Sequence, residues 1–97
     1  MTYRFLTPAV REITEAAQFY DSRVSGLGAD FLDELEAAIA RILQFPEAWG
    51  FLSHPFRRCA LRRFPYTIIY TLPTPQDVVI VSVFHQHRKP LSWKRNI

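Results

Sequence analysis

The amino-acid sequence predicts an α+β fold in which an N-terminal strand and an antiparallel helical hairpin pack on a mostly antiparallel sheet of about four strands. Two stretches, residues 10–24 and 31–43, place apolar side chains three and four positions apart, which is the period of a helix. The second half of the chain instead carries short segments rich in β-branched and aromatic residues. Two amphipathic helices packed only on each other would leave apolar surface uncovered, so the helices need this sheet.

The first half of the chain predicts one strand followed by two helices. Residues 3–6 suit a half-buried strand, and Thr7 followed by Pro8 is typical of a helix start with Thr7 as the N-cap. We expect the first helix to span Pro8 to Val24, and the second to follow a Ser-Gly-Leu-Gly turn and to stop before Pro46. The first helix is expected to bury a stripe made of Val10, Ile13, Ala17, Tyr20 and Val24. The stripe of the second helix comprises Phe31, Leu32, Leu35, Ile39, Ile42 and Leu43.

The second half predicts a loop, three strands and a C-terminal turn of helix. The loop covers residues 46–55, and Trp49 and Phe51 within it are expected to reach the core. The strands are expected at residues 57–61, 66–72 and 78–84. The last strand is almost continuously apolar, which predicts that it is covered on both faces and is therefore central in the sheet.

Length and composition limit the class of protein. The 97 residues fit one domain, residues 1–97, and a single Cys excludes an intrachain disulfide and a zinc site built from several thiolates. The longest apolar run, residues 78–84, is too short to cross a membrane, and residues 1–8 hold no signal-peptide run. We therefore expect a soluble cytoplasmic protein with no cofactor, no bound metal and no membrane partner.

The net charge of +3 hides a strong division along the chain. Residues 1–50 hold four Arg and eight acidic residues, a balance of −4. Residues 51–97 hold eight Lys and Arg and one acid, Asp77, a balance of +7. A half this basic predicts an anionic partner, either a nucleic acid or an acidic protein segment.

Three segments carry a family pattern. Residues 26–46 contain a Gly-Leu-Gly opening, a Phe-Leu-x-Glu-Leu centre and a closing Phe-Pro, residues 62–66 read Arg-Arg-Phe-Pro-Tyr, and residues 83–90 read Val-Phe-His-Gln-x-Arg-x-Pro. The pattern resembles the RelE/ParE superfamily of toxins from bacterial type II toxin–antitoxin systems, also called plasmid stabilisation proteins, and it is nearer to ParE. The resemblance implies the RelE/ParE-like fold and a cognate antitoxin whose segment is disordered until it wraps the toxin. It also implies that DNA is contacted only indirectly, through the antitoxin complex.

The superfamily contains two activities, and one sequence position bears on the choice. RelE-like members are ribosome-dependent endoribonucleases that cut mRNA, whereas ParE-like members bind DNA gyrase and are not enzymes. The RelE-like branch typically has an Arg just after the aromatic residue that begins the third strand, and this chain has Thr67 there. A Thr supplies no fixed positive charge for a phosphate. The resemblance therefore favours growth inhibition through gyrase, with ribosome-dependent mRNA cleavage as the alternative and a degenerate binding module as a third hypothesis.

Candidate site residues come from the same segments. In a nuclease, proton transfer and phosphate contacts would fall to Arg62, Arg63, His85, His87 and Arg88. A target-binding surface would comprise Arg58, Arg62, His85, Arg88, Lys89 and Trp93. The Trp93 indole is able to stack on a base or a guanidinium group. His85 and His87 share a face if the strand continues through them, and they are candidates for proton transfer or direct target contact. The alternative is that a histidine at the end of the strand caps backbone groups or packs on Trp93.

Overall fold

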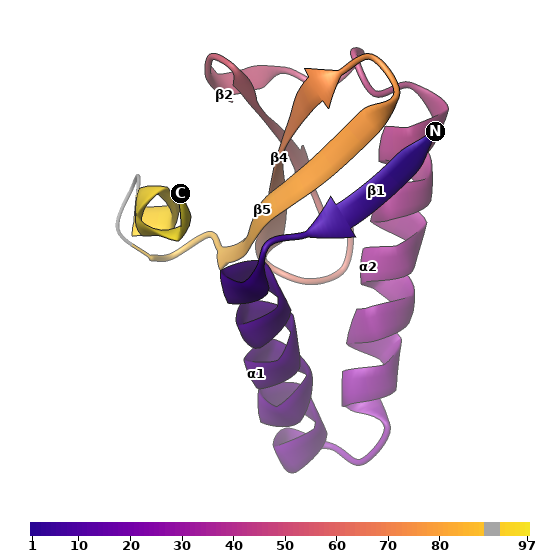
Figure 1. The fold of residues 1–97 in the computed structure, drawn as a ribbon. Helices are drawn as coiled ribbons and strands as arrows, with labels where there is room; N and C mark the ends of the chain where they lie inside the picture. Colours follow the sequence, from indigo (N-terminus) through magenta and orange to yellow (C-terminus); the bar gives the residue numbers. More distant parts are fainter. Residues whose placement is uncertain (89–91) are drawn as a thin grey trace.

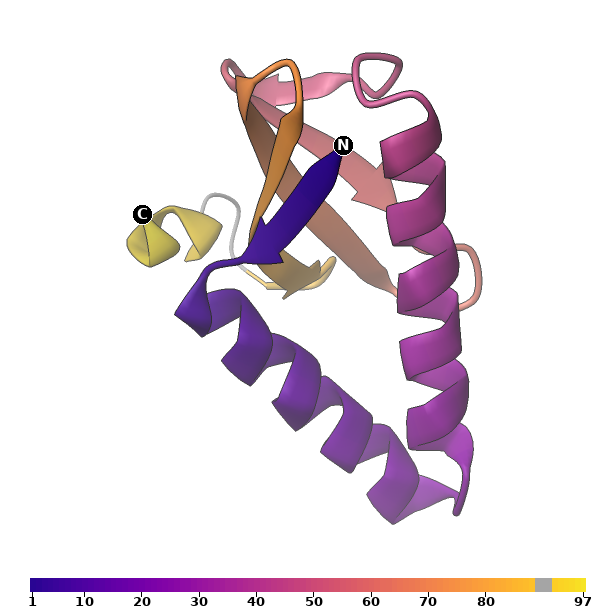
Figure 2. The same ribbon diagram turned by 45° about the vertical axis from the view of Figure 1, so that its right-hand side comes forward.

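The computed structural model describes residues 1–88 and 92–97. In chain order its elements are β1 (Thr2–Phe5), α1 (Thr7–Arg23), α2 (Leu27–Gln44), β2 (Phe51–Ser53), β3 (Phe56–Ala60), β4 (Tyr66–Thr74), β5 (Asp77–His85) and the 3₁₀ helix η1 (Ser92–Asn96) (Figure 1). The predicted α+β fold is confirmed: α1 and α2 form a hairpin against one face of the sheet, and η1 packs on the other (Figures 1 and 2). Within the described ranges, no helix combines the length and apolarity needed to cross a membrane.

The sheet has five strands, in the order β1-β5-β4-β3-β2, where about four were expected. β1 runs parallel to β5, and the other neighbours are antiparallel. The additional strand, β2, lies inside the predicted loop, because three residues with a shifted register are too few to show an alternating pattern. Trp49 packs on the core as expected, but Phe51 on this edge strand is 46% exposed. Its ring instead lies 3.9 Å from the Arg57 guanidinium carbon.

The turn between α1 and α2 is held by Asp21. Its Oδ1 accepts hydrogen bonds from the N–H groups of Gly26 (2.9 Å) and Gly28 (3.3 Å). Gly26 has a φ of +89°, and a Cβ on Gly28 would lie 2.5 Å from the Ala17 carbonyl oxygen. Both positions therefore require glycine, and the predicted turn is confirmed.

Helix α1 begins one residue earlier than predicted. Thr7 is its first residue, and the extended Leu6 is the N-cap, with no side-chain hydrogen bond. The Leu6 carbonyl accepts hydrogen bonds from the N–H groups of Ala9 (3.0 Å) and Val10 (3.2 Å). The expected Thr7 cap is wrong because the chain passes directly from β1 into the helix, and the Leu6 N–H still donates to the Ile80 carbonyl at 3.0 Å.

The main core lies between the helical hairpin and the sheet. Four of the residues predicted for the α2 stripe are buried in it, Phe31, Leu35, Ile39 and Ile42, and Ala38, which was not predicted, is buried beside them. The stripe on α1 differs from the prediction, because Val10 and Val24 are exposed while Ala9 and Ala16, which were not predicted, are its buried residues. The predicted residues that pack against this core are Ile13, Ala17 and Tyr20. Leu32, placed in the α2 stripe by the sequence, is exposed as well. Toward the turn that joins them, the two helices extend beyond the sheet (Figure 2).

A β-bulge at Val81 changes which side chains of β5 face the helices. Ile69 pairs with Ser82, and the next residue, Tyr70, pairs with Ile80. Val81 therefore has no opposite residue on β4. Before the bulge, even-numbered side chains of β5 pack on the helix-side core, and after it odd-numbered ones do. The bulge thus places the last residue of β5 on the helix side of the sheet.

Candidate functional site

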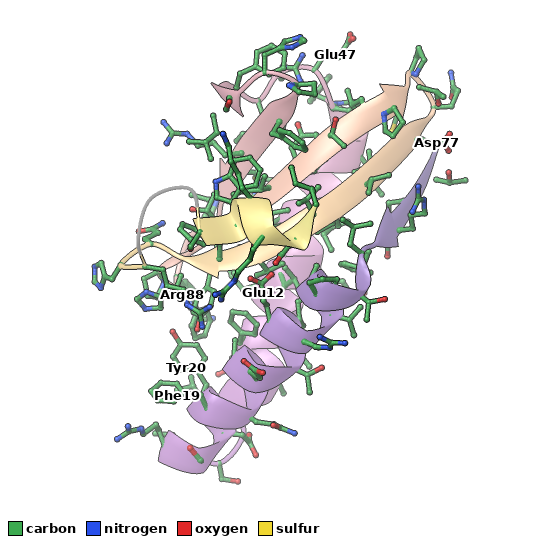
Figure 3. The ribbon with its side chains drawn as sticks, turned by 60° about the vertical axis from the view of Figure 1, so that its left-hand side comes forward. Glu12, Phe19, Tyr20, Glu47, Asp77 and Arg88 are labelled. Atoms are coloured by element: carbon green, nitrogen blue, oxygen red, sulfur yellow. The ribbon has the colours of Figure 1, made fainter. Side chains whose placement is uncertain are left out.

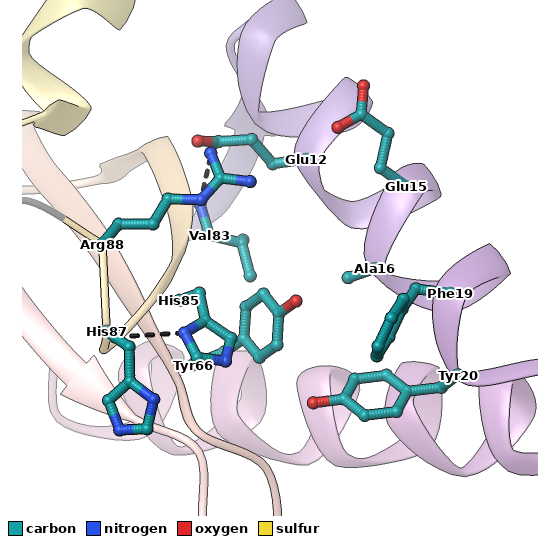
Figure 4. A pocket seen from close by; sticks show the side chains of 10 residues that line it. All are labelled: Glu12, Glu15, Ala16, Phe19, Tyr20, Tyr66, Val83, His85, His87 and Arg88. Atoms are coloured by element: carbon teal, nitrogen blue, oxygen red, sulfur yellow. Dashed lines mark hydrogen bonds between the residues drawn. The ribbon is translucent and has the colours of Figure 1, made fainter. Parts of the chain in front are cut away.

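A cleft of about 470 Å³ opens between α1 and the ends of β4 and β5. We call it the helix-side cleft. One wall is a face of α1 made of Glu12, Glu15, Ala16, Phe19 and Tyr20. The other wall is made of Tyr66, Val83, His85, His87 and Arg88 (Figure 4). The cleft therefore brings three residues singled out from the sequence together with aromatic side chains that were not.

The end of β5 and the turn after it position the two histidines. His85 pairs with Tyr66 across the ladder, and the centroids of their rings are 5.0 Å apart. β5 ends at His85, so His87 lies in the turn and not in a continued strand. The His87 N–H donates to His85 Nδ1 at 3.0 Å (Figure 4). Because an N–H only donates, this Nδ1 carries no proton, and neutral His85 holds its proton on Nε2.

Three titratable side chains of the cleft, those of His85, Tyr66 and Tyr20, stay uncharged at neutral pH. Burial lowers the pKa of His85, and the positive charges of His87 and Arg88 lower it further. Burial raises the pKa of Tyr66, as does the neighbouring Tyr20, while Arg88 acts in the opposite direction. Burial also raises the pKa of Tyr20. The cleft thus offers a neutral imidazole and two phenols as hydrogen-bonding groups, with the Arg88 cation at their border.

Glu12 ties α1 to β5 and to the C-terminal segment. Its Oε1 accepts hydrogen bonds from Ser82 Oγ (2.9 Å), the Val83 N–H (3.1 Å) and Asn96 Nδ2 (3.1 Å). Asn96 Nδ2 also donates to the Val81 carbonyl at 3.0 Å. These side chains satisfy backbone groups at the edge of β5 that the short β1 does not reach. Figure 3 shows Glu12 at the junction between α1 and η1, on the floor of the cleft.

The opposite face of the sheet carries a second cavity of about 460 Å³, which we call the outer-sheet hollow. It is lined by Leu52, Arg58, Ala60, Thr67, Ile69, Phe84 and Gln86. Thr67, the position at which the RelE-like pattern has an Arg, faces this hollow. Among the described residues that line it, Arg58 is the only cation and no His, Asp or Glu is present. The hollow thus lacks the acid and base groups of a site for proton transfer.

Arg62 and Arg63 line neither cavity. Both are exposed in the bend between β3 and β4. The Arg62 N–H donates to the Glu34 carboxylate at 2.9 Å, and the Arg63 guanidinium carbon lies 5.8 Å from the Phe64 ring centroid. The structure thus separates these two candidate nuclease residues from the other three. It also divides the target-binding set, because Arg58 lies on the outer face of the sheet.

Trp93 belongs to neither surface. Its side chain is 1% exposed, and its ring centroid lies 5.0 Å from that of Phe56 in a second core cluster with Ile69 and Val81. The stacking role expected for Trp93 is therefore wrong, because a buried indole has no face to offer a partner. Lys89, also expected on the target-binding surface, lies outside the described residues.

The aromatic side chains of the cleft that were not singled out from the sequence as site residues are Phe19, Tyr20 and Tyr66. The helical period assigned Tyr20 to the core, and Tyr66 entered only as the start of a strand. Phe19 is 49% exposed, and a large aromatic side chain outside the apolar stripe of a helix was the available signal. In the part of the chain that the structure describes, no three His, Cys, Asp or Glu side chains gather around a possible metal position.

Comparison with known proteins addresses the family and the fold. Residues 3–90 match the family model described as "ParE toxin of type II toxin-antitoxin system, parDE". A solved structure described as "Chromosomal ParDE TA system from P. aeruginosa" is similar, with a TM-score of 0.75 and 13% sequence identity. The match covers 88% of this chain and 95% of that chain, and at this identity it bears on the fold alone. The search among curated proteins found no match.

Proposed function

Since the chain belongs to the ParE toxin family of type II toxin–antitoxin systems, we propose that it inhibits growth by binding DNA gyrase in the cytoplasm and that a cognate antitoxin neutralises it. In this proposal the helix-side cleft contacts gyrase, with His85 and Arg88 as binding residues. The toxin then acts by holding its target and not by catalysing a reaction.

The observation that carries the proposal is the separation of the candidate nuclease residues. Cleavage of RNA by its own 2′-hydroxyl needs a proton acceptor, a proton donor and fixed cations around one phosphate. Here the two imidazoles line the helix-side cleft, Arg62 and Arg63 lie in the β3–β4 bend, and Thr67 faces the outer-sheet hollow. The helix-side cleft holds one fixed cation, Arg88, beside these imidazoles, and the further cation pair that the nuclease hypothesis uses lies outside it. The arrangement favours a toxin that binds a protein target over a ribonuclease.

Two reconstituted assays with the purified toxin separate these activities. We expect the toxin to inhibit DNA supercoiling by gyrase and to increase the amount of gyrase-cleaved DNA. In a translation reaction we expect ribosome-bound mRNA to stay intact. The toxin–antitoxin complex at equal concentration is the control and should leave gyrase active. Toxin that cuts ribosome-bound mRNA while gyrase remains unaffected would establish the RelE-like alternative.

A groove of about 350 Å³ beside β1 supports neutralisation by an antitoxin segment. Its lining is almost entirely apolar, and Tyr3, Val10 and Leu32 in it are 45%, 47% and 43% exposed. β1 is an edge strand. The N–H groups of Thr2 and of Leu6, which follows the strand, donate to the carbonyls of Gln76 and Ile80, so the backbone groups of the alternate residue Tyr3 point away from the sheet. An extended segment is able to pair with this edge and to place alternate apolar side chains in the groove.

The charge of the groove also predicts one feature of the antitoxin segment that binds there. Glu36 is the single charged residue among the described residues that line it. We therefore expect the antitoxin segment to alternate apolar residues along a strand and to carry one basic residue that meets Glu36.

One substitution separates antitoxin binding from toxicity. Leu32→Arg introduces a charge into the groove, so we expect the variant to stay toxic when the antitoxin is co-expressed and to fail to co-purify with it. Leu52→Arg is the matched control, because Leu52 is also exposed but lines the outer-sheet hollow. Co-purification of the Leu32→Arg variant at the wild-type level would show that the antitoxin binds elsewhere.

A further inference from the structure

We propose that a groove along α1 binds single-stranded DNA, with phosphates at its basic end and an unpaired base at its aromatic end. This α1 groove consists of the helix-side cleft and an adjoining cavity of about 290 Å³ beside the start of α1. The two cavities share Glu12, Glu15 and Arg88, so they form one continuous surface. The inference rests on the proposed function in that gyrase supplies the DNA. It departs from the sequence-based expectation that DNA is contacted only through the antitoxin complex.

One face of α1 forms one wall of the groove along its whole length. From Pro8 to Tyr20, the lining residues of the helix recur at spacings of one, three and four. These twelve steps, at about 1.5 Å each, span roughly 18 Å. The opposite wall is formed in turn by η1, by the turn after β5 and by the start of β4. A groove of this length suits a short strand of nucleic acid better than a single small molecule.

Three arginines from three separate segments meet at the basic end. Arg11 comes from α1, Arg88 from the turn after β5 and Arg95 from η1. All three side chains are exposed, so their guanidinium groups are accessible to a ligand. Guanidinium groups bind phosphate oxygens through paired hydrogen bonds. The positive end of the α1 dipole lies at the same end of the groove and adds to the attraction for phosphate.

Two carboxylates at this end of the groove lower its affinity for phosphate. The Glu12 carboxylate already accepts hydrogen bonds from three donors on β5 and η1, which offsets part of its charge. Glu15 is exposed in the section that both cavities share, so it repels a phosphate there. We therefore expect the free toxin to bind DNA weakly, with a Kd of roughly 10⁻⁴ to 10⁻⁶ M at physiological salt, as for other non-specific nucleic-acid contacts.

The aromatic end selects single-stranded DNA over duplex DNA. The ring of Phe19 is half exposed, and the hydroxyl groups of Tyr20 and Tyr66 point into the open cleft (Figure 4). An unpaired base of any sequence is able to stack on an exposed ring such as that of Phe19, and the two hydroxyl groups are able to form hydrogen bonds with it. The bases of a duplex are already stacked on one another, so a duplex is able to use only the arginines.

Fluorescence anisotropy with labelled eight-nucleotide strands tests the inference on the full-length toxin. We expect Arg88→Ala and Arg95→Ala each to weaken binding of oligo(dT) about tenfold and to lower the salt slope by about 1. Glu15→Gln, which keeps the shape of the side chain, should tighten binding because it removes a repulsive charge. Arg58→Ala removes a cation from the outer-sheet hollow and should leave binding unchanged. An abasic strand of equal length and a duplex should bind more weakly than oligo(dT).

Three results would overturn the inference: no binding of oligo(dT), binding that Arg88→Ala and Arg95→Ala leave unchanged, or equal binding of a duplex. Gyrase assays on the same proteins keep the two proposals distinct. If oligo(dT) binding follows the groove substitutions while gyrase stays active, the α1 groove stands and the gyrase proposal fails. If gyrase is inhibited while oligo(dT) does not bind, the gyrase proposal stands and the α1 groove is wrong.

Discussion

The two faces of the sheet carry different chemistry although their residues alternate along the same two strands. Tyr66 and Thr67 are adjacent in the chain, yet Tyr66 lines the helix-side cleft and Thr67 the outer-sheet hollow. Phe84 and His85 are divided in the same way on β5. The helix-side cleft therefore collects imidazole, phenol and guanidinium groups, while the outer-sheet hollow holds mainly apolar and neutral polar ones.

Because side chains alternate along a strand, the residues of one sequence motif are divided between the two faces of the sheet. The Val-Phe-His-Gln run contributes Val83 and His85 to one cavity, and Phe84 and Gln86 to the other. Which pair faces the helices is decided by the bulge at Val81. A role is therefore assigned to a residue of such a motif only when the face of the sheet on which its side chain lies is known.

The largest expected loss of stability comes from the core cluster on the outer face of the sheet, which contains Trp93. Trp93→Ala should lower the free energy of unfolding by about 3–5 kcal/mol, because truncation of a buried aromatic ring leaves a cavity. Urea unfolding followed by circular dichroism measures this change. Trp93→Phe is the control and should lose much less, since it keeps a ring and removes an indole N–H that has no hydrogen-bond partner among the described residues. If Trp93→Ala kept the stability of the wild type but lost toxicity, Trp93 would instead be assigned to the target-binding surface.

The next largest loss of stability is expected from the hydrogen bonds by which Glu12 joins α1 to β5 and η1 on the helix side. Glu12→Ala should lower the free energy of unfolding by about 2–3 kcal/mol, because it leaves the Val83 N–H and the Ser82 hydroxyl without their acceptor. Glu15→Ala, one turn further along the same face and exposed, should change it by less than about 0.5 kcal/mol. The same urea titrations compare the two variants. Equal losses for both would mean that Glu12 does not hold the segments together.

The smallest effect is a pH dependence that belongs to the helix-side cleft alone. Because the pKa of His85 is lowered in the folded protein, the unfolded chain binds a proton more readily at this site. The contribution of His85 to stability should be complete above its unfolded pKa of about 6.5, and it should decline as the pH falls from there to the folded pKa.

NMR titration of the His85 ring measures this shift directly. The midpoint should lie below 6.5, and Arg88→Gln should raise it because one of the positive charges that lower this pKa is removed. The spectrum of the neutral form should show the proton on Nε2, since Nδ1 accepts the His87 N–H. A midpoint that Arg88→Gln leaves in place would mean that the guanidinium does not act on His85.

Local patterns were sufficient to predict most of the architecture. The α2 stripe and the central position of β5 were predictable because helical period and continuous apolarity are properties of neighbouring residues. The bulge at Val81 was not, because the run Val-Val-Ile-Val-Ser-Val has no alternation for a bulge to interrupt. Strand β2 was missed because three residues define no period.

The candidate site was predictable only in part, for a different reason. His85 and Arg88 lie in one motif and were found together. The basic end of the α1 groove combines Arg11 with Arg88 and Arg95, and only the packing of α1 against β5 and η1 brings these distant positions together. The aromatic wall from α1 was hidden in the same way, because its partner residues lie on β4 and β5.

Inhibition of gyrase by paired variants tests the central claim most directly. The measurement is the toxin concentration that halves supercoiling by purified gyrase, for the wild type, the double variant His85→Ala/Arg88→Ala and the outer-face variant Arg58→Ala, each at confirmed folded concentration. If the helix-side cleft contacts the target, the double variant should need at least about tenfold more toxin, a loss of about 1.4 kcal/mol, while Arg58→Ala should match the wild type. Full inhibition by the double variant together with loss of inhibition in Arg58→Ala would contradict the account and assign the target to the outer-sheet hollow.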